Sequence, residues 1–337
     1  MHLIVDQFGS FIGKKSERLR VTLKGEVVQE IPFFKLKSVM VIARGVSISS
    51  DAIYHCVQQG IPVNFLSYTG KPYARVLSPH LTGTVRTRRE QLLAYEDGRG
   101  VALGRAFAVG KLSNQANLLK YMAKYRKGRD RELYRDVRDA AIEIQVLCDQ
   151  LQRLEGERID DLRAPLMNLE GRGASIYWEM VGRLLRADVH WPGREHRGAQ
   201  DPVNAALNYG YGILYSQVEG AIILAGLDPY AGFVHVDRPG KPSLVLDLIE
   251  EFRQPVVDRT VFGLVNKGVA IELDAQGRLI EETRKLLATK VLDRLEGRER
   301  YEGKKHKLRV ILHRQAQQIA TFVRRERGEY RPFVAGW

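Results

Sequence analysis

Three carboxylates crowd one short and mostly apolar stretch of the chain. In "SLVLDLIEEFRQP", residues 243–255, Asp247, Glu250 and Glu251 stand among leucine, valine, isoleucine and phenylalanine. On a helix these acids and Gln254 fall within one arc, while the apolar side chains cover the other side. A solvated face of an amphipathic helix therefore explains the stripe by itself.

The residues before this stretch favour a chemical role. "GFVHVDRPGKP" predicts a short strand bearing His235, then a turn through Pro239 and Gly240, with Ser243 as candidate N-cap of the helix. Imidazole and carboxylate oxygens suit Mg²⁺ or Mn²⁺, and such sites support phosphoryl transfer. The alternative is that His235, between two valines, is a hydrogen-bonded core residue.

A further acid and a base accompany these residues. Glu170 lies in the apolar helical segment "LMNLEGRGASIYWEM", and Gly173 and Ala174 leave room there for a bulky ligand. Close helix packing with Glu170 reaching solvent is equally compatible with that pattern. Arg253, three residues after Glu250, shares the acidic face and either clamps a phosphate or makes an ion pair.

The charge balance points to a polyanionic partner. The formal net charge is +13 over 337 residues, which favours nucleic acid first and an anionic membrane second. Basic clusters contain Lys124 and Arg126 beside two tyrosines, Arg86 and Arg89, and residues 304–325. They can bind phosphates without sequence specificity, and the tyrosines can stack on a splayed base. A solvated helix face explains any single cluster.

The chain has two halves that differ in the spacing of their apolar residues, and the elements in these halves must position the candidate site residues. Roughly the first 75 residues predict short strands punctuated by Gly and Pro, interrupted by a helix in "SSDAIYHCVQQG". From about residue 86 the spacing is helical, as in "RELYRDVRDAAIEIQVLCDQLQRLEG". The predicted fold class is α+β with two domains: a small, mainly-β domain (1–75), a linker (76–88) and a larger all-α catalytic domain (89–337).

Cysteine usage and the N-terminus indicate a cytoplasmic protein. Cys56 and Cys148 lie far apart in apolar surroundings, so we expect small buried thiols in a reducing compartment. The N-terminus lacks a signal-peptide pattern. The longest apolar stretch, residues 205–227, is interrupted by polar residues and falls short of a transmembrane span.

The motifs resemble a known family. "LMNLEGRGASIYW", "DPVNAALNYGYGILY" and above all "GFVHVDRPGKPSLVLDLIEEFRQPVVD" are similar to the CRISPR-associated adaptation integrase, the first-numbered protein of that system. The last segment matches the family's His, then Ser-Leu, then Asp-Leu-x-Glu-x-Phe-Arg-x-Pro pattern almost throughout. The resemblance covers essentially the whole chain.

The resemblance implies a role for each site residue. Carried over by position, the ligands of a Mg²⁺ or Mn²⁺ ion fall on Glu170, His235 and Glu250. Asp247 matches a further acidic position at or beside the metal, and Arg253 a basic position near it. Tyr211 falls in the family's Asn-rich helix, where a tyrosine approaches the DNA. Glu251 is expected to be an ordinary surface charge.

The family also implies partners and a reaction. Homodimers form through the β domains, and the small second-numbered protein bridges two of them into a heterohexameric integrase. The 3′-hydroxyl of a double-stranded spacer precursor attacks a phosphodiester of the CRISPR repeat. Two alternatives stay open: a structure-selective repair endonuclease that uses water at the same residues, and a non-catalytic basic DNA-binding scaffold.

Overall fold

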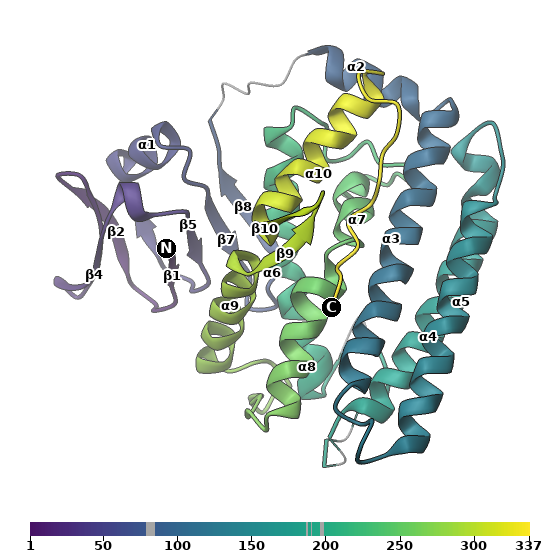
Figure 1. Ribbon diagram of the computed structural model, residues 1–337. Coiled ribbons are helices and arrows are strands. Elements are labelled where there is room, and N and C mark those ends of the chain that lie inside the picture. The colour runs from purple at the N-terminus through teal and green to yellow at the C-terminus, as the bar shows by residue number, and fades with distance from the viewer. Residues whose placement is uncertain (79–84, 187, 190, 196–198) are drawn as a thin grey trace. The chain divides into compact units, whose positions relative to one another are not determined.

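The chain forms two compact units, each with its own contacts. The computed structural model describes residues 1–337 apart from 79–84, 187, 190 and 196–198 (Figure 1). The first unit comprises residues 1–81, 198–216 and 271–293, and the second comprises residues 82–197, 217–270 and 294–337. The predicted linker 76–88 includes residues outside the described part, and the domain boundaries remain a prediction.

The strands of the first unit form two four-stranded sheets. They are β1 His2–Val5, β2 Phe11–Lys15, β3 Arg18–Leu23, β4 Glu26–Pro32, β5 Ser38–Val41, β6 Ser47–Ile48, β7 Val63–Leu66 and β8 Pro72–Val76. One sheet has the order β1-β5-β7-β8, with parallel β1–β5 and β5–β7 pairs and an antiparallel β7–β8 pair. The other has the order β4-β3-β2-β6. A short 3-10 helix, Phe33–Lys35, links β4 and β5.

Alternating apolar residues of both sheets build one core in this unit. Leu3 and Val5 of β1 are buried together with Ile12 of β2 and Leu19 of β3, as expected for strands with one face inward. Helix α1 (Ser50–Gln58) adds Cys56 to that core.

The ends of α1 follow from its sequence. The Ser49 side chain accepts a hydrogen bond from the Ala52 N–H at 3.2 Å, which caps the first turn. Gly60 follows the helix with φ +64°, a left-handed conformation that glycine adopts without a steric penalty.

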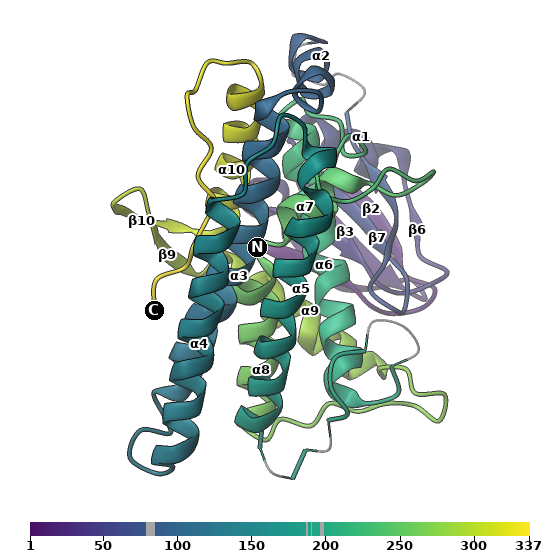
Figure 2. The same cartoon turned by 90° about the vertical axis from the view of Figure 1, so that its right-hand side faces the viewer.

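The second unit is dominated by long helices. They are α2 Val85–Ala94, α3 Gly98–Ala123, α4 Arg131–Gln152, α5 Ile159–Leu184, α7 Ser243–Ile249, a π-helix Arg253–Asp258, α8 Arg259–Asn266 and α10 Leu308–Val323. Helices α3, α4 and α5 run side by side (Figures 1 and 2). Two further helices are α6 (Pro202–Leu224) and α9 (Glu281–Glu296), and the division into units falls within their residue ranges.

The predicted fold class is confirmed: N-terminal strands precede a larger helical region. One detail of the helical half was wrong. Residues 298–307 form an antiparallel hairpin of β9 (Arg298–Tyr301) and β10 (Lys304–Lys307), so the basic residues at 304–307 precede α10 rather than lie on it. Gly303, with φ +78°, allows the tight turn. No helix in the described part of the chain is long and apolar enough to span a bilayer.

Candidate active site

The acidic stretch is not one continuous helix as expected. Helix α7 ends at Ile249, and a π-helix begins at Arg253. Pro255 lacks an N–H and its ring would clash with the carbonyl of Glu251, four residues earlier, so an α-helix cannot pass this point undistorted. The Asn114 side chain on α3 donates instead to the Glu251 carbonyl at 2.9 Å. Glu250 therefore lies at a break in the helix.

The expected solvated stripe is buried. Relative exposure is 1% for Asp247, 6% for Glu250, 0% for Glu251 and 1% for Gln254. The expectation that Glu251 is an ordinary surface charge was therefore wrong. Helical periodicity places these acids on one face, but the second unit packs helices and the C-terminal segment around that face as well.

Asp247 organises the loop that carries His235. One carboxylate oxygen accepts the backbone N–H groups of Phe233 and Val234 at 2.6 and 3.2 Å. The other accepts the His235 N–H at 3.1 Å and faces His235 Nδ1 at 2.7 Å. These N–H groups bond to a carboxylate and not to a neighbouring strand, so the strand expected around His235 is absent and a bend takes its place.

The start of α7 also differs from the expectation. The helix begins at Ser243, so Pro242 and not Ser243 occupies the N-cap position. The Ser243 hydroxyl lies within 3.5 Å of the Val236 carbonyl and 3.4 Å of the Lys241 carbonyl. The predicted turn through Pro239 and Gly240 is present, closed by a bridge between Arg238 and Lys241.

A lysine joins Glu170 to Glu250. Lys111 Nζ on α3 contacts Glu170 Oε1 of α5 and lies 3.0 Å from Glu250 Oε2. Arg253 Nη2 lies 3.3 Å from the other oxygen of Glu250. Two carboxylates from distant parts of the chain are thus paired with two cations in a mostly buried cluster.

The pKa values of this cluster reflect its charge pairs. Burial acts to raise the pKa of the Glu250 carboxyl, but the charges of Arg253 and Lys111 outweigh it and hold that pKa below its usual range. Burial acts to lower the pKa of the Lys111 ammonium, and the charges of Glu250 and Glu170 keep it above its usual value. Glu250 and Lys111 are consequently both ionised at neutral pH.

The chemistry of these side chains fits a divalent cation. Glu170 and Glu250 already share one positive charge. With Asp247 accepting from Nδ1, His235 keeps Nε2 for a metal, as ligating histidines usually do. Within the described residues no three His, Cys, Asp or Glu side chains form a metal-binding group, and the Lys111 ammonium contacts both Glu170 and Glu250. A divalent ion would therefore replace the lysine ammonium between them.

The residues predicted to contact DNA are distributed over several elements. Arg253 is at the site itself. Arg86 and Arg89 are exposed on α2. Lys124 follows α3, with its ammonium 5.9 Å from the centre of the Tyr121 ring, and Arg126 donates to the Leu184 carbonyl at 3.3 Å. Tyr211 lies on α6, in the segment that belongs to the first unit.

Sequence reasoning missed two residues of α3 that contact the candidate site. Lys111 and Asn114 lie in "AVGKLSNQANLL", where they are one turn apart in an otherwise small and apolar helix. A lysine within a helix that apolar residues dominate is a usable signal, because a buried ammonium needs a carboxylate partner. The identity of that partner could not be read from the local sequence.

The chain is similar to known proteins over nearly its whole length. The family model described as "CRISPR associated protein Cas1" matches residues 3–292. The chain belongs to the Cas1 family. The "CRISPR-associated endonuclease Cas1 1" of Archaeoglobus fulgidus is 38% identical to this Cas1 chain over 348 residues, covering 100% of each.

Solved structures share the fold of this Cas1 chain. A "Casposase bound to integration product" superposes with a TM-score of 0.82 at 20% identity, covering 98% of this chain and 92% of that one. A chain of a "Cas6-RT-Cas1--Cas2 complex" superposes with a TM-score of 0.73 at 21% identity, covering 99% of this chain and 36% of that one. At these identities the likeness establishes the fold.

Proposed function

We propose that this Cas1 chain is a metal-dependent DNA integrase that joins the 3′-hydroxyl of spacer DNA to a phosphodiester of a CRISPR repeat. The observation that carries the proposal is the cluster at the end of α7. Two carboxylates from different helices share one cation, beside a histidine that a buried carboxylate orients.

Glu170, Glu250 and His235 Nε2 are the atoms proposed to hold Mg²⁺ or Mn²⁺. When bound, such an ion polarises a phosphate and stabilises charge on the attacking and leaving oxygens. Asp247 holds His235 in the tautomer with the proton on Nδ1 and fixes its loop. Arg253, next to Glu250, would supply positive charge for the phosphate oxygens.

The reaction exchanges one phosphodiester for another. The spacer 3′-oxygen forms a new bond to phosphorus and gives up its proton, and the bond from phosphorus to the repeat's own 3′-oxygen breaks. The released 3′-oxygen takes up a proton. With water as nucleophile the same residues would cleave DNA, so an endonuclease activity belongs to the same mechanism.

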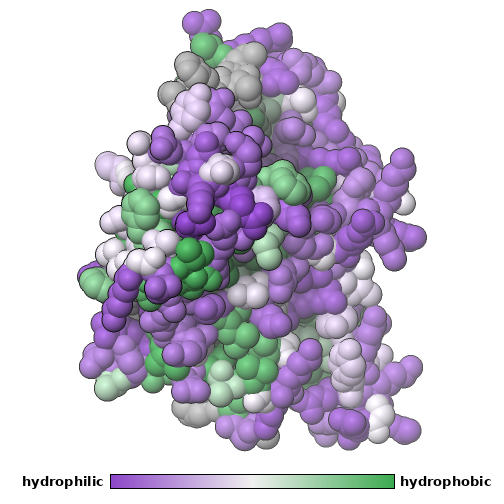
Figure 3. Space-filling view, turned by 90° about the vertical axis from the view of Figure 1, so that its left-hand side faces the viewer, coloured by the Kyte–Doolittle hydropathy of each residue, from purple (hydrophilic) through white to green (hydrophobic). Residues whose placement is uncertain are grey.

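The proposed partners are double-stranded DNA, a second copy of this chain and the small Cas2 protein, in a heterohexamer in the cytoplasm. The net charge of +13 supports a DNA partner. The Cas6-RT-Cas1--Cas2 complex among the structural neighbours supports Cas2. Three phenylalanines of the first unit are exposed: Phe8 by 77%, Phe11 by 45% and Phe34 by 79%. Hydrophobic patches also interrupt a mostly hydrophilic face of the molecule (Figure 3). Exposed apolar side chains of this kind suit a dimer contact.

A strand-transfer assay tests the proposal. It combines the full chain, Cas2, a duplex with a free 3′-hydroxyl, a plasmid bearing the repeat, and Mn²⁺. We expect half-site products that disappear with EDTA, in His235→Ala and in Glu250→Ala. Glu251→Gln is not a suitable control because Glu251 is buried beside the site, so the exposed Asp237→Asn serves instead.

The assay also separates the alternatives. Cleavage without joining, whether or not Cas2 is present, would support the repair endonuclease. DNA binding without any reaction would support the non-catalytic scaffold. Full joining activity in both alanine variants would overturn the assignment of the metal ligands.

A further inference from the structure

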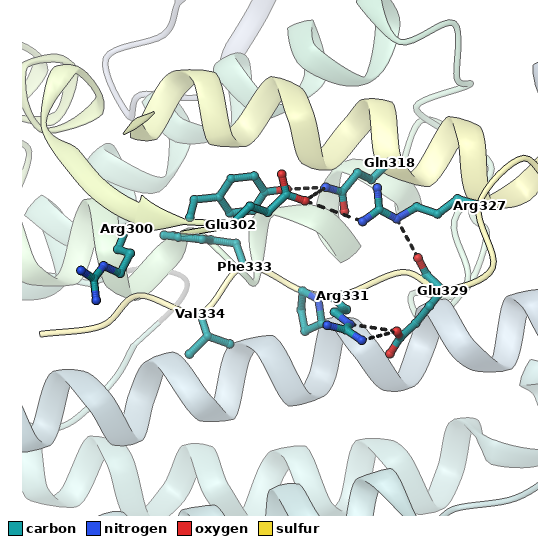
Figure 4. A pocket seen from close by; sticks show the side chains of 10 residues that line it. Arg300, Glu302, Gln318, Arg327, Glu329, Arg331, Phe333 and Val334 are labelled. Carbon is teal, nitrogen blue, oxygen red and sulfur yellow. Dashed lines mark hydrogen bonds and ion pairs between the residues drawn. The ribbon is translucent and has the colours of Figure 1, made fainter. Parts of the chain in front are cut away.

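The C-terminal segment crosses the second unit as an extended chain. Residues 329–337 run between α10 and α3 (Figures 1 and 4). On one side they border an open pocket of about 570 Å³ that Arg300, Glu302 and Arg327 help to line. Phe333 and Ala335 of the segment are 1% and 0% exposed. The segment therefore buries Tyr330, Phe333 and Ala335 in the core, while Arg331 and Val334 remain exposed.

Glu251 is the anchor of this segment. Tyr330 Oη donates to Glu251 Oε1 at 2.6 Å. The Phe333 N–H and Gln315 Nε2 donate to Glu251 Oε2 at 2.8 and 2.7 Å. Burial raises the pKa of the Glu251 carboxyl to about 7 despite these donors. Both oxygens of this fully buried carboxyl group thus accept hydrogen bonds.

Helix α3 completes the attachment. Asn114 Nδ2 donates to the carbonyls of both Glu251 and Phe333 at 2.9 Å, and its Oδ1 accepts the Ala335 N–H at 2.8 Å. Asn117 Nδ2 donates to the Ala335 carbonyl at 2.9 Å. The segment is thus bonded to α3 along several residues.

The absence of a side chain at Gly110 allows the segment to approach α3. A Cβ there would lie 2.8 Å from Pro332 Cβ and 3.1 Å from Glu251 Cγ. The ring of Phe333 stacks on that of Phe252, with centroids 5.4 Å apart. Glu251 and Phe252, the two residues of the break that follow Glu250, are therefore held by the C-terminal segment or by α3.

We propose that the C-terminal segment is a positioning element for Glu250. Glu250 lies at a helix break, where the N–H groups of Glu250, Glu251 and Phe252 donate to carbonyls three residues earlier, at 3.3, 3.3 and 2.9 Å, in place of the regular α-helical bonds to the fourth residue back. The contacts of Glu251 and Phe252 with the segment constrain this turn, while Lys111 on α3 faces Glu250 from the same helix that carries Asn114. Tyr330, Asn114 and Phe333 are positioning residues: they touch Glu251 or Phe252 and act on the metal site through them.

This inference rests on the proposed metal-dependent function, and the experiment separates the two. The test variant is Tyr330→Phe, which keeps the ring and removes the hydroxyl that bonds to Glu251. The matched control is Tyr177→Phe, because the buried Tyr177 donates at 2.7 Å to another buried carboxylate, Asp258. Three quantities are measured on the full chain: Tm in EDTA, Kd for Mn²⁺ by calorimetry, and hydrogen exchange of the peptide spanning 244–254.

Both variants are expected to lose similar thermal stability. Only Tyr330→Phe should weaken Mn²⁺ binding, on the order of tenfold as for other residues that support a ligand, and only it should speed exchange in 244–254. Asn117→Ala, which loosens the segment without touching Glu251, should change both quantities in the same direction by less.

Different outcomes test the positioning role and the metal-dependent function. Wild-type Mn²⁺ affinity and wild-type exchange in Tyr330→Phe would overturn the positioning role and leave the metal site standing. Absence of Mn²⁺ binding in the wild-type chain would remove the metal-dependent function, and faster exchange in Tyr330→Phe alone would still support control of the Glu250 turn by the segment. If Tyr330→Phe does not fold, Asn117→Ala decides by the same two readouts.

Discussion

Lys111 sets the charge balance of the site. Its ammonium contacts Glu170 and Glu250, which would repel each other without a cation between them. The proposed divalent ion would compete with this ammonium for the same carboxylate oxygens. Lys111 is thus the residue whose removal distinguishes a structural ion pair from a metal site.

We expect Lys111→Met to lower the stability of the metal-free protein, by about 3–5 kcal/mol as for other broken buried pairs. Mn²⁺ should raise Tm more in this variant than in the wild type, because the ion supplies the missing positive charge. Thermal unfolding with and without Mn²⁺ measures both effects. Lys120→Met on the same helix is the control, and an equal Mn²⁺ response in both variants would contradict the interpretation.

Asp247 fixes the loop that carries His235 and orients the His235 ring. We expect Asp247→Asn to reduce strand transfer on the order of 10- to 100-fold, as for other residues that orient a ligand. The amide NH₂ would face N–H donors of residues 233–235, so the loop should also lose stability. Joining rates and Tm are compared with Asp237→Asn, whose side chain is exposed. Equal losses in both variants would be inconsistent with this role.

At the scale of elements, α3 connects the site to the C-terminal segment. It presents Lys111 to the carboxylates and Asn114 to the backbone of Glu251 and Phe333. Gly110 lies in the same part of the helix, where the segment packs against it. A side chain introduced at Gly110 tests how closely α3 and the C-terminal segment must pack.

Gly110→Ala is expected to destabilise the protein by about 1–3 kcal/mol, because the methyl group overpacks the contact with Pro332 and Glu251. Gly263→Ala on α8 is the matched control, since a Cβ there meets nothing within 4 Å. It should be neutral or stabilising by up to about 1 kcal/mol through helix propensity. Urea unfolding of both variants measures the difference, and a stabilised Gly110→Ala would refute the close packing.

At the scale of the whole molecule, the two units contain one buried cysteine each. Cys56 belongs to the core of the first unit, and Cys148 is buried on α4 of the second. Both thiols are free, as the sequence predicted. Burial raises the pKa of each to about 11, so the reactive thiolate is scarce at pH 8.

We expect neither cysteine to react with a thiol reagent at pH 8 until its own unit opens. Mass spectrometry of labelled peptides during a urea titration would report each unit separately. Between pH 9 and 11 the unfolded chain loses the thiol protons first, so stability should fall as pH rises through this window. Cys56→Ala and Cys148→Ala should each flatten that dependence, and rapid labelling of either thiol in native buffer would contradict the burial.

Much of this protein follows from local sequence. Alternation of apolar residues places the strands β1, β3, β4, β5, β7 and β8 but not β2 or β6, helical spacing places α4, α6, α9 and α10, and Ser49 and Gly60 mark the ends of α1. These signals succeed because secondary structure depends on residues a few positions apart. The motif around residues 235–253 likewise pointed to the site before its geometry was known.

Only the tertiary structure decided the environment of the individual site residues. Periodicity shows which side of α7 the carboxylates occupy, but other elements determine that this side is buried. Glu251 was expected at the surface and instead anchors the C-terminal segment. The ion pairs of Lys111 with Glu170 and Glu250 form only in the folded chain. Burial and charge pairing arise between residues far apart in the chain, so no local pattern contains them.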